Sequence, residues 1–260
     1  MKFTLKSIVA LFIGSALLFS SCKKDEGTAP ELPPLSSMSI DIETFEQDNA
    51  NQRIAGDTTY VAAGAAALTM SFWNTVLVLN LATPVAAFKE AFNHVAVYDG
   101  DAKDWTWSYN FGVYKANKAE LHGKVEGASV KWTMYITLYG KSQVVWYTGT
   151  SDINALGGTW SINKDVDDPK EYLTIAWTRT SDEVADIVYT YTYPDEATGS
   201  YIQYGEQTGE YDVFYKIYLA KDDKTTNIEF DRTTKQGHIK STPSTEWACW
   251  NSSYIDVDCQ

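Results

Sequence analysis

The sequence has few cysteines, few histidines and little positive charge, and each shortage narrows what the protein does. Its 260 residues include three cysteines and three histidines, and 21 lysines and arginines compare with 34 aspartates and glutamates, for a formal net charge of −13. We find no basic stripe, and an acidic surface repels phosphate backbones, so we expect no nucleic-acid partner. At 44% apolar and 21% charged residues, the composition is that of a globular protein with one domain or at most two smaller ones.

The chain also lacks a recognisable catalytic or metal-binding motif. His94, His122 and His238 lie in separate segments, and no two of them have the spacing of metal ligands. The acidic turn at 99–104 has neither the glycine nor the closing glutamate of an EF-hand, and no G-x-S-x-G nucleophile motif is present. We therefore predict no catalytic residues, no metal and no cofactor. A hydrolase with dispersed carboxylates stays open as the lowest-ranked alternative, because the separation of such carboxylates is a property of the fold.

The amino terminus has the pattern of an export signal. Lys2 and Lys6 precede an apolar run at 8–19 that is too short to cross a bilayer, and two serines and Cys22 follow it. We expect residues 1–21 to be removed as a signal peptide. Removal of its two lysines leaves 19 basic against 34 acidic residues, a net charge of −15.

The segment around Cys22 resembles a bacterial lipobox, Leu18-Phe19-Ser20-Ser21-Cys22, with Phe19 in place of the usual aliphatic residue. This resemblance implies that Cys22 is acylated and that acyl chains attach the protein to a membrane. The following Lys23-Lys24-Asp25-Glu26 resembles the lipoprotein export signal of Bacteroidota, which implies the outer face of the outer membrane. The alternatives are a simple secretory signal and a solvated charged tether.

Cys249 and Cys259 are the two cysteines that remain, ten positions apart. In an oxidising compartment they are expected to form a disulfide that closes a small terminal loop. The domain organisation that follows from these segments is a signal peptide at 1–21, an acylated cysteine with a flexible tether at 22–55, and a single domain at 56–260.

A charge-free, alanine-rich stretch from Tyr60 to Ala82 predicts a long helix. Thr83 and Pro84 are then expected to open a second short helix as its N-cap and first residue. The first stretch is long enough for a membrane span, but several polar residues interrupt it. Because its polar positions do not gather on one face, we predict a buried helix.

After His94 the apolar residues alternate with polar ones, beginning with Trp105, Trp107, Tyr109, Phe111 and Val113. This period of two predicts half-buried strands, and the short links between them predict antiparallel pairing in a meander. The expected fold class is mainly β, with a strongly curved sheet or barrel around the long apolar helix. The alternative is a β-sandwich with the helix at one end.

Aromatic residues make up 14% of the chain. Most are expected to fill the core, because aromatic side chains favour strands and bury large areas. A second interpretation is that the run Tyr189, Tyr191 and Tyr193, or outward-facing Tyr135 and Tyr139, forms a flat platform that binds a sugar or another apolar ligand.

Residues 55–260 resemble a family of uncharacterised Bacteroidota lipoproteins, on the motifs Trp105-Thr106-Trp107-Ser108-Tyr109, Gly158-Thr159-Trp160, Glu229-Phe230-Asp231-Arg232 and Trp247-Ala248-Cys249-Trp250. The resemblance implies no known activity. From the residues we expect a non-enzymatic envelope lipoprotein that either holds an apolar ligand beside its helix or serves as an envelope scaffold. The alternative is a surface module that binds carbohydrate.

Overall fold

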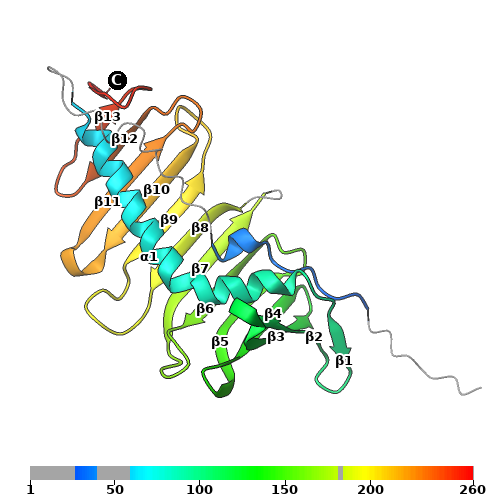
Figure 1. The fold of residues 1–260 in the computed structure, drawn as a ribbon. Coiled ribbons are helices and arrows are strands. Elements are labelled where there is room, and N and C mark those ends of the chain that lie inside the picture. Colours follow the sequence, from blue (N-terminus) through cyan, green and yellow to red (C-terminus); the bar gives the residue numbers. More distant parts are fainter. Residues whose placement is uncertain (1–26, 40–58, 181–183, 260) are drawn as a thin grey trace, which may run out of the picture.

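The fold is a single antiparallel sheet with one long helix across one of its faces (Figure 1). The computed structural model describes residues 27–39, 59–180 and 184–259, so the predictions for the signal peptide, Cys22 and the segment after it up to residue 26 lie outside the described residues. The helix α1 spans Val61–Ala91, and short 3-10 helices lie at Leu35–Ser37 (η1), Val113–Lys115 (η3) and Ala220–Asp222 (η4). The mainly β fold class is confirmed.

Every strand pairs with its neighbours in the sequence, in the order β1 to β14. The strands are β1 Val97–Asp99, β2 Asp104–Phe111, β3 Asn117–Glu126, β4 Ser129–Leu138, β5 Lys141–Asp152, β6 Gly157–Asn163, β7 Glu171–Arg179, β8 Val184–Tyr191, β9 Tyr201–Glu206, β10 Val213–Leu219, β11 Lys224–Phe230, β12 Gly237–Ser241, β13 Ala248–Trp250 and β14 Asp256–Val257. Short links permit only this antiparallel meander. In the described part of the chain β14 does not pair with β1. Of the two forms expected, a strongly curved sheet or a barrel, the sheet is therefore the open, curved one and not a closed barrel.

The core lies between α1 and the face of the sheet that the helix covers. Tryptophan side chains fill much of it, and four of them lie over a glycine on the neighbouring strand: the register pairs are Gly123 with Trp132, Gly149 with Trp160, Gly158 with Trp177, and Gly237 with Trp250. A methyl group on Gly149 would lie 2.2 Å from the Trp160 ring, so only glycine leaves room for the indole there. This arrangement, in which an aromatic ring covers a strand glycine, stabilises the pairing of adjacent strands.

The helix is continuous from Val61 to Ala91, although two helices were expected. Pro84 lies inside it rather than at the start of a second helix. Proline has no N–H to donate and therefore frees the carbonyl of Asn80 four residues earlier. The hydroxyl of Tyr172, from β7, donates to that carbonyl at 3.1 Å, so the sheet replaces the hydrogen bond that the helix lacks.

The helix is also less buried than expected. One side packs on the sheet through Met70, Leu81 and Phe88, each at most 1% exposed, whereas Leu68 and Leu79 on the other side are 70% and 74% exposed. By length and composition α1 could cross a membrane, but its buried side contacts β2 and β12 at opposite ends of the sheet. The polar residues of α1 did not indicate which side of the helix is buried, because apolar side chains occupy both of its sides.

The start of α1 is held by the carboxyl-terminal segment. Asp256 in β14 accepts hydrogen bonds from the backbone N–H groups of Val61 and Ala62, each at 3.0 Å, and from the hydroxyl of Thr59. The sulfur atoms of Cys249 and Cys259 lie 2.06 Å apart, which confirms the predicted pair. The disulfide closes the loop that carries Asp256.

Part of the expected tether packs against the sheet. Met38 is fully buried, and the Ser37 hydroxyl accepts a hydrogen bond from the indole N–H of Trp160 at 3.1 Å. Arg179 in β7 forms an ion pair with Glu31 at 3.0 Å. Residues around η1 therefore belong to the folded unit. The sequence did not indicate this, because a few isolated apolar residues pack into the core here without a periodic pattern.

Candidate functional site

The three tyrosines predicted as a ligand platform lie on the helix-covered face of β8 and just beyond it. Tyr189 is 2% exposed, and its hydroxyl donates to the backbone carbonyl of Met38 at 3.5 Å, so it belongs to the core. Tyr191 and Tyr193 are half-buried and line a cleft beside α1. The even spacing directs these residues towards the helix, so Tyr189 packs in the core while Tyr191 and Tyr193 line the cleft.

This cleft lies between α1 and the ends of β7 and β8. It is next to the turn of α1 in which Asn80 accepts the hydrogen bond from Tyr172. Two adjoining pockets share the residues Asn80, Tyr172 and Tyr191. Burial raises the pKa of Tyr172 to about 12, so its hydroxyl stays protonated and keeps donating to the Asn80 carbonyl. The tyrosine thus fixes one wall of both pockets.

The first pocket, of about 270 Å³, is apolar. Its walls come from the middle of α1, from β7 and β8, and from the loop that follows β8. The lining residues are Phe72, Trp73, Val76, Leu77, Asn80, Tyr172, Leu173, Tyr189, Tyr191, Ala197, Ser200 and Leu219. A concave apolar wall with a few polar groups at one end is typical of a small-ligand site.

The second pocket, of about 330 Å³, is more polar and lies next to the first. Lys164 places its ammonium 4.6 Å from the centre of the Tyr193 ring and 3.8 Å from a carboxylate oxygen of Asp168. The Tyr193 hydroxyl also donates a hydrogen bond to the Asp168 carboxylate, at 3.0 Å. The polar end of the cleft is therefore lined by the Lys164 ammonium and by tyrosine hydroxyls, and Asp168 behind them pairs with both Lys164 and Tyr193.

The loop after β8 forms one wall of the apolar pocket through Ala197 and Ser200. The Tyr191 hydroxyl donates to Asp195 at 2.7 Å, and the backbone N–H of Asp195 in turn donates to the Thr198 hydroxyl at 2.9 Å. Partial burial and the Asp195 carboxylate raise the pKa of Tyr191 to about 12. This neutral hydroxyl holds the loop against the strand and thereby shapes one wall of the cleft.

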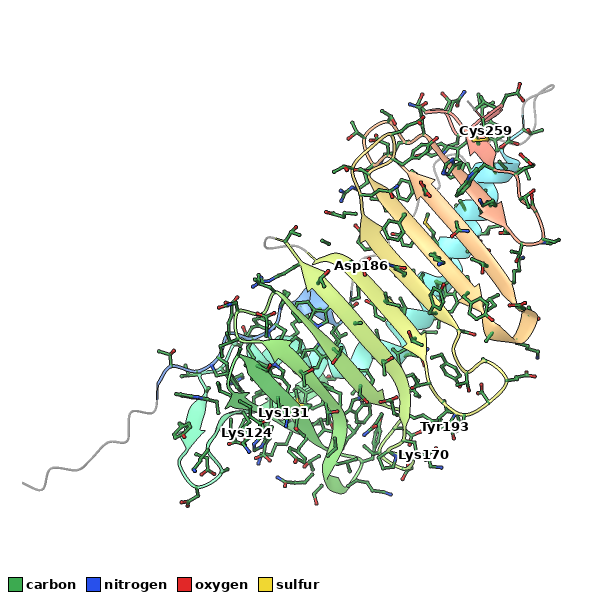
Figure 2. The ribbon with its side chains drawn as sticks, turned by 180° about the vertical axis from the view of Figure 1, so that it is seen from behind. Lys124, Lys131, Lys170, Asp186, Tyr193 and Cys259 are labelled. Carbon is green, nitrogen blue, oxygen red and sulfur yellow. A yellow bond between two sulfur atoms is a disulfide. The ribbon has the colours of Figure 1, made fainter. Side chains whose placement is uncertain are left out.

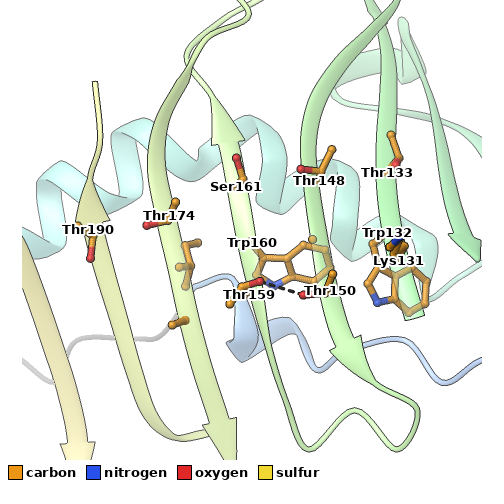
Figure 3. Close-up of a pocket in the computed structure, with 13 residues that line it drawn as sticks. Lys131, Trp132, Thr133, Thr148, Thr150, Thr159, Trp160, Ser161, Thr174 and Thr190 are labelled. Atoms are coloured by element: carbon orange, nitrogen blue, oxygen red, sulfur yellow. Dashed lines mark hydrogen bonds between the residues drawn. The ribbon is translucent and has the colours of Figure 1, made fainter. Parts of the chain in front are cut away.

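A groove of about 590 Å³ lies on the opposite, outer face of the sheet, which the helix does not cover (Figure 2, Figure 3). Its floor is a row of hydroxyl side chains that are register partners from β4 to β8: Thr133, Thr148, Ser161, Thr174 and Thr190. A second row contains Thr150 and Thr159, whose hydroxyl oxygens lie 3.1 Å apart. Hydroxyl groups therefore recur at the strand spacing of about 4.8 Å.

The groove has no exposed aromatic platform. The rings of Trp132 and Trp160 belong to the core side, and each indole is about 1% exposed. Of the other two tyrosines considered from the sequence, Tyr135 lies half-buried on the outer face beside His122, and Tyr139 is 85% exposed in the turn after β4. The structure does not bring these two together with the β8 tyrosines.

One histidine has the surroundings of a catalytic base. The Nδ1 of His122 lies 2.9 Å from a carboxylate oxygen of Asp104 and 3.3 Å from the Thr106 hydroxyl. Both contacts use the same ring nitrogen, and among the described residues no hydroxyl or thiol forms a hydrogen bond with Nε2. Within 27–39, 59–180 and 184–259, no three His, Cys, Asp or Glu side chains come together as metal ligands.

The fold and these sites define an open meander sheet with a helix on one face, a cleft at their junction and a hydroxyl-lined groove on the other face. No known protein family matches the chain, and no curated protein and no solved structure matches it either.

Sequence reasoning missed Asn80, Tyr172, Lys164 and the walls of the cleft. The signal that could have located them is Pro84 within an otherwise helical pattern, because the carbonyl that a proline frees needs a donor from another element. No pattern in the sequence names that donor.

Proposed function

We propose that the protein is a non-enzymatic cell-envelope lipoprotein that binds an apolar or amphipathic ligand in the cleft between α1 and β7–β8. The observation that carries the proposal is the apolar pocket with a polar neighbour. An apolar chain fits between Phe72 and Leu173, and a polar group at its end fits beside Lys164 and Asn80. Burial of an apolar chain favours binding by about 25 cal/mol per Å² of surface removed from water.

The anchor is part of the same proposal. Acyl chains on Cys22 would attach the protein to the outer membrane, and the Lys23-Lys24-Asp25-Glu26 segment after it supports exposure at the cell surface. Cys22→Ser is expected to move the protein from the detergent phase to the aqueous phase. Continued retention in the detergent phase would count against lipidation.

The ligand proposal is tested by filling the pocket. Ala197 lines the apolar pocket and Ala176 lies in the outer groove, so Ala197→Trp and Ala176→Trp place the same bulk at two different sites. We expect Ala197→Trp to abolish binding of a long-chain fluorescent fatty acid, and Ala176→Trp to leave it unchanged. Equal binding by both variants and the wild type would refute the cleft as the site.

A second candidate function is binding of a polysaccharide along the outer groove. The rows of threonine and serine hydroxyls favour it, because regularly spaced hydroxyls can both donate to and accept from sugar hydroxyls. For this function Ala176→Trp is the test variant and Ala197→Trp is the control. Retention on an immobilised polysaccharide that Ala176→Trp removes and Ala197→Trp preserves would support this function, and retention by neither the wild type nor the variants would refute it.

A further inference from the structure

The outward side of α1 carries a continuous apolar stripe. We define the helix stripe as the exposed residues that follow one another in alternating steps of four and three: Val61, Ala65, Leu68, Phe72, Thr75, Leu79, Ala82, Ala86 and Lys89. Among them Val61, Leu68, Phe72 and Leu79 are 71%, 70%, 61% and 74% exposed. Soluble proteins rarely expose four large apolar side chains in one line. A contiguous apolar patch of this kind marks an interaction site.

The spacing of the helix stripe specifies the shape of what covers it. Steps of four and three place the residues at the a and d positions of a heptad, which is the pattern that packs against another α-helix. The other side of the same helix uses a second set, including Met70 and Leu77, to pack on the sheet. The helix stripe is therefore surplus to the fold of one chain.

The lack of charge on α1 also limits the kind of partner that can cover the helix stripe. From Val61 to Phe88 the helix has no charged side chain, although the chain as a whole has a net charge of −13. A helix that lies in a membrane surface carries several lysines or arginines on its polar face, whereas this helix has only Lys89, in its last turn. An uncharged heptad stripe instead fits an identical stripe.

We propose that the helix stripe pairs with the same stripe of a second copy of this chain, forming a two-fold symmetric dimer through α1. An antiparallel register matches sizes along the whole stripe. Phe72 then lies opposite Thr75 of the second copy, Leu68 opposite Leu79, and Ala65 opposite Ala82. The same contacts repeat on both sides of the axis, as an isologous interface requires.

The length of the stripe suits such an interface. At about 1.5 Å per residue, the 31 residues of α1 extend for about 46 Å. The positions that flank the stripe, such as Ser71, Val76 and Val78, carry no charge and add area without repulsion. Phe72 and Leu79 of the helix stripe also line the cleft, whereas Leu68 and Ala82 line neither of its pockets. Substitutions at Leu68 and Ala82 therefore test the pairing separately from the ligand proposal.

The first experiment measures the mass of the full-length protein in detergent by light scattering, corrected for the detergent. We expect twice the mass of one mature chain for the wild type. Leu68→Glu and Ala82→Glu should weaken dimerisation roughly a hundredfold, because each puts unpaired carboxylates into the interface. Leu156→Glu is the matched control, since Leu156 is 48% exposed in the turn between β5 and β6 and is not part of the helix stripe, and it should remain dimeric.

Cysteine trapping in native membranes provides a second measurement that does not depend on detergent. In the antiparallel register, Ala65→Cys and Ala82→Cys chains cross-link when mixed, and neither cross-links with itself. Cross-links within each single variant would refute this register. A monomeric wild type, a dimer that both glutamate variants leave intact, or vesicle binding that Leu68→Glu removes without a change of mass would overturn the proposal.

Discussion

Replacement of Asp256 by alanine is the substitution whose effect follows most directly from the structure. Two backbone N–H groups at the start of α1 point at this carboxylate, and the intrahelical ladder offers them no acceptor. Asp256 comes from β14, so it functions as an N-cap supplied from almost two hundred residues away. Its loss leaves these two N–H groups without their acceptor and weakens the attachment of the helix to the last strand of the sheet.

The magnitude combines two contributions. Loss of an N-cap side chain costs about 0.5–2 kcal/mol, and loss of a carboxylate at the positive end of a helix costs about 0.3–1 kcal/mol. We expect Asp256→Ala to lower the free energy of unfolding by about 2 kcal/mol, which for a domain of this size lowers Tm by roughly 4–8 °C. Asp256→Asn keeps one acceptor oxygen and loses the charge, so its loss should be about half as large.

The effect has a defined pH dependence. Burial alone would raise the pKa of Asp256, but hydrogen bonds from Thr59, Ala62 and Val61 outweigh it and hold the pKa below its ordinary value. The unfolded chain therefore binds the proton more readily than the folded one. The stability that Asp256 contributes is complete above an unfolded pKa of about 3.9 and disappears as the pH falls through the lower folded value.

Urea denaturation followed by circular dichroism, at pH 7 and at acidic pH, measures both properties. Asp258→Ala is the matched control, because Asp258 is exposed in the same disulfide-closed loop. The reasoning is refuted if Asp256→Ala and Asp258→Ala have the same stability at pH 7, or if the deficit of Asp256→Ala grows rather than shrinks as the pH is lowered.

Three further predictions concern the core and the cleft. Tyr172→Phe leaves the Asn80 carbonyl without its donor and should lower the free energy of unfolding by about 1–3 kcal/mol, measured in urea. Burial lowers the pKa of His238 in spite of a nearby carboxylate, so the unfolded chain binds a proton more readily than the folded one. The domain should therefore lose stability as the pH falls below about 6.5, and thermal melts of the wild type and His238→Phe over this pH range measure the loss. Gly149→Ala should destabilise the sheet by about 1–3 kcal/mol, because its methyl group meets the Trp160 ring.

Controls for these predictions come from exposed or unhindered positions. Tyr114→Phe changes a side chain that is 97% exposed and should leave the urea midpoint unchanged. Gly64→Ala adds a methyl group on α1 where nothing lies within 4 Å, and should stabilise the helix by about 0.5–1 kcal/mol. A pH profile of His238→Phe identical to that of the wild type would contradict the role given to His238.

Local patterns in the sequence predicted a large part of the fold. Alternation around Trp107 and Tyr109 identified β2, and the short polar breaks correctly indicated a meander. The spacing of Cys249 and Cys259 indicated their pairing. Each of these properties depends on the side-chain period or on chain length, which neighbouring residues encode.

Other properties depend on partners that are distant in the chain, and the sequence alone did not decide them. Nothing in the residues around Pro84 indicates that Tyr172 completes its turn of helix, and nothing near Val61 indicates that Asp256 caps it. Closure of the sheet also depends on the twist of all its strands together, so a barrel and an open sheet share one sequence pattern.

By itself, the sequence determined the strand order, the long helix and the terminal disulfide, because short links and side-chain periodicity leave few alternatives. Only the tertiary structure decided which side of α1 is buried, where the cleft lies and that Tyr189 belongs to the core. The physical reason is that α1 is apolar on both sides. The hydrophobic effect drives either side towards the sheet, and the fit of particular side chains against the strands selects one of them.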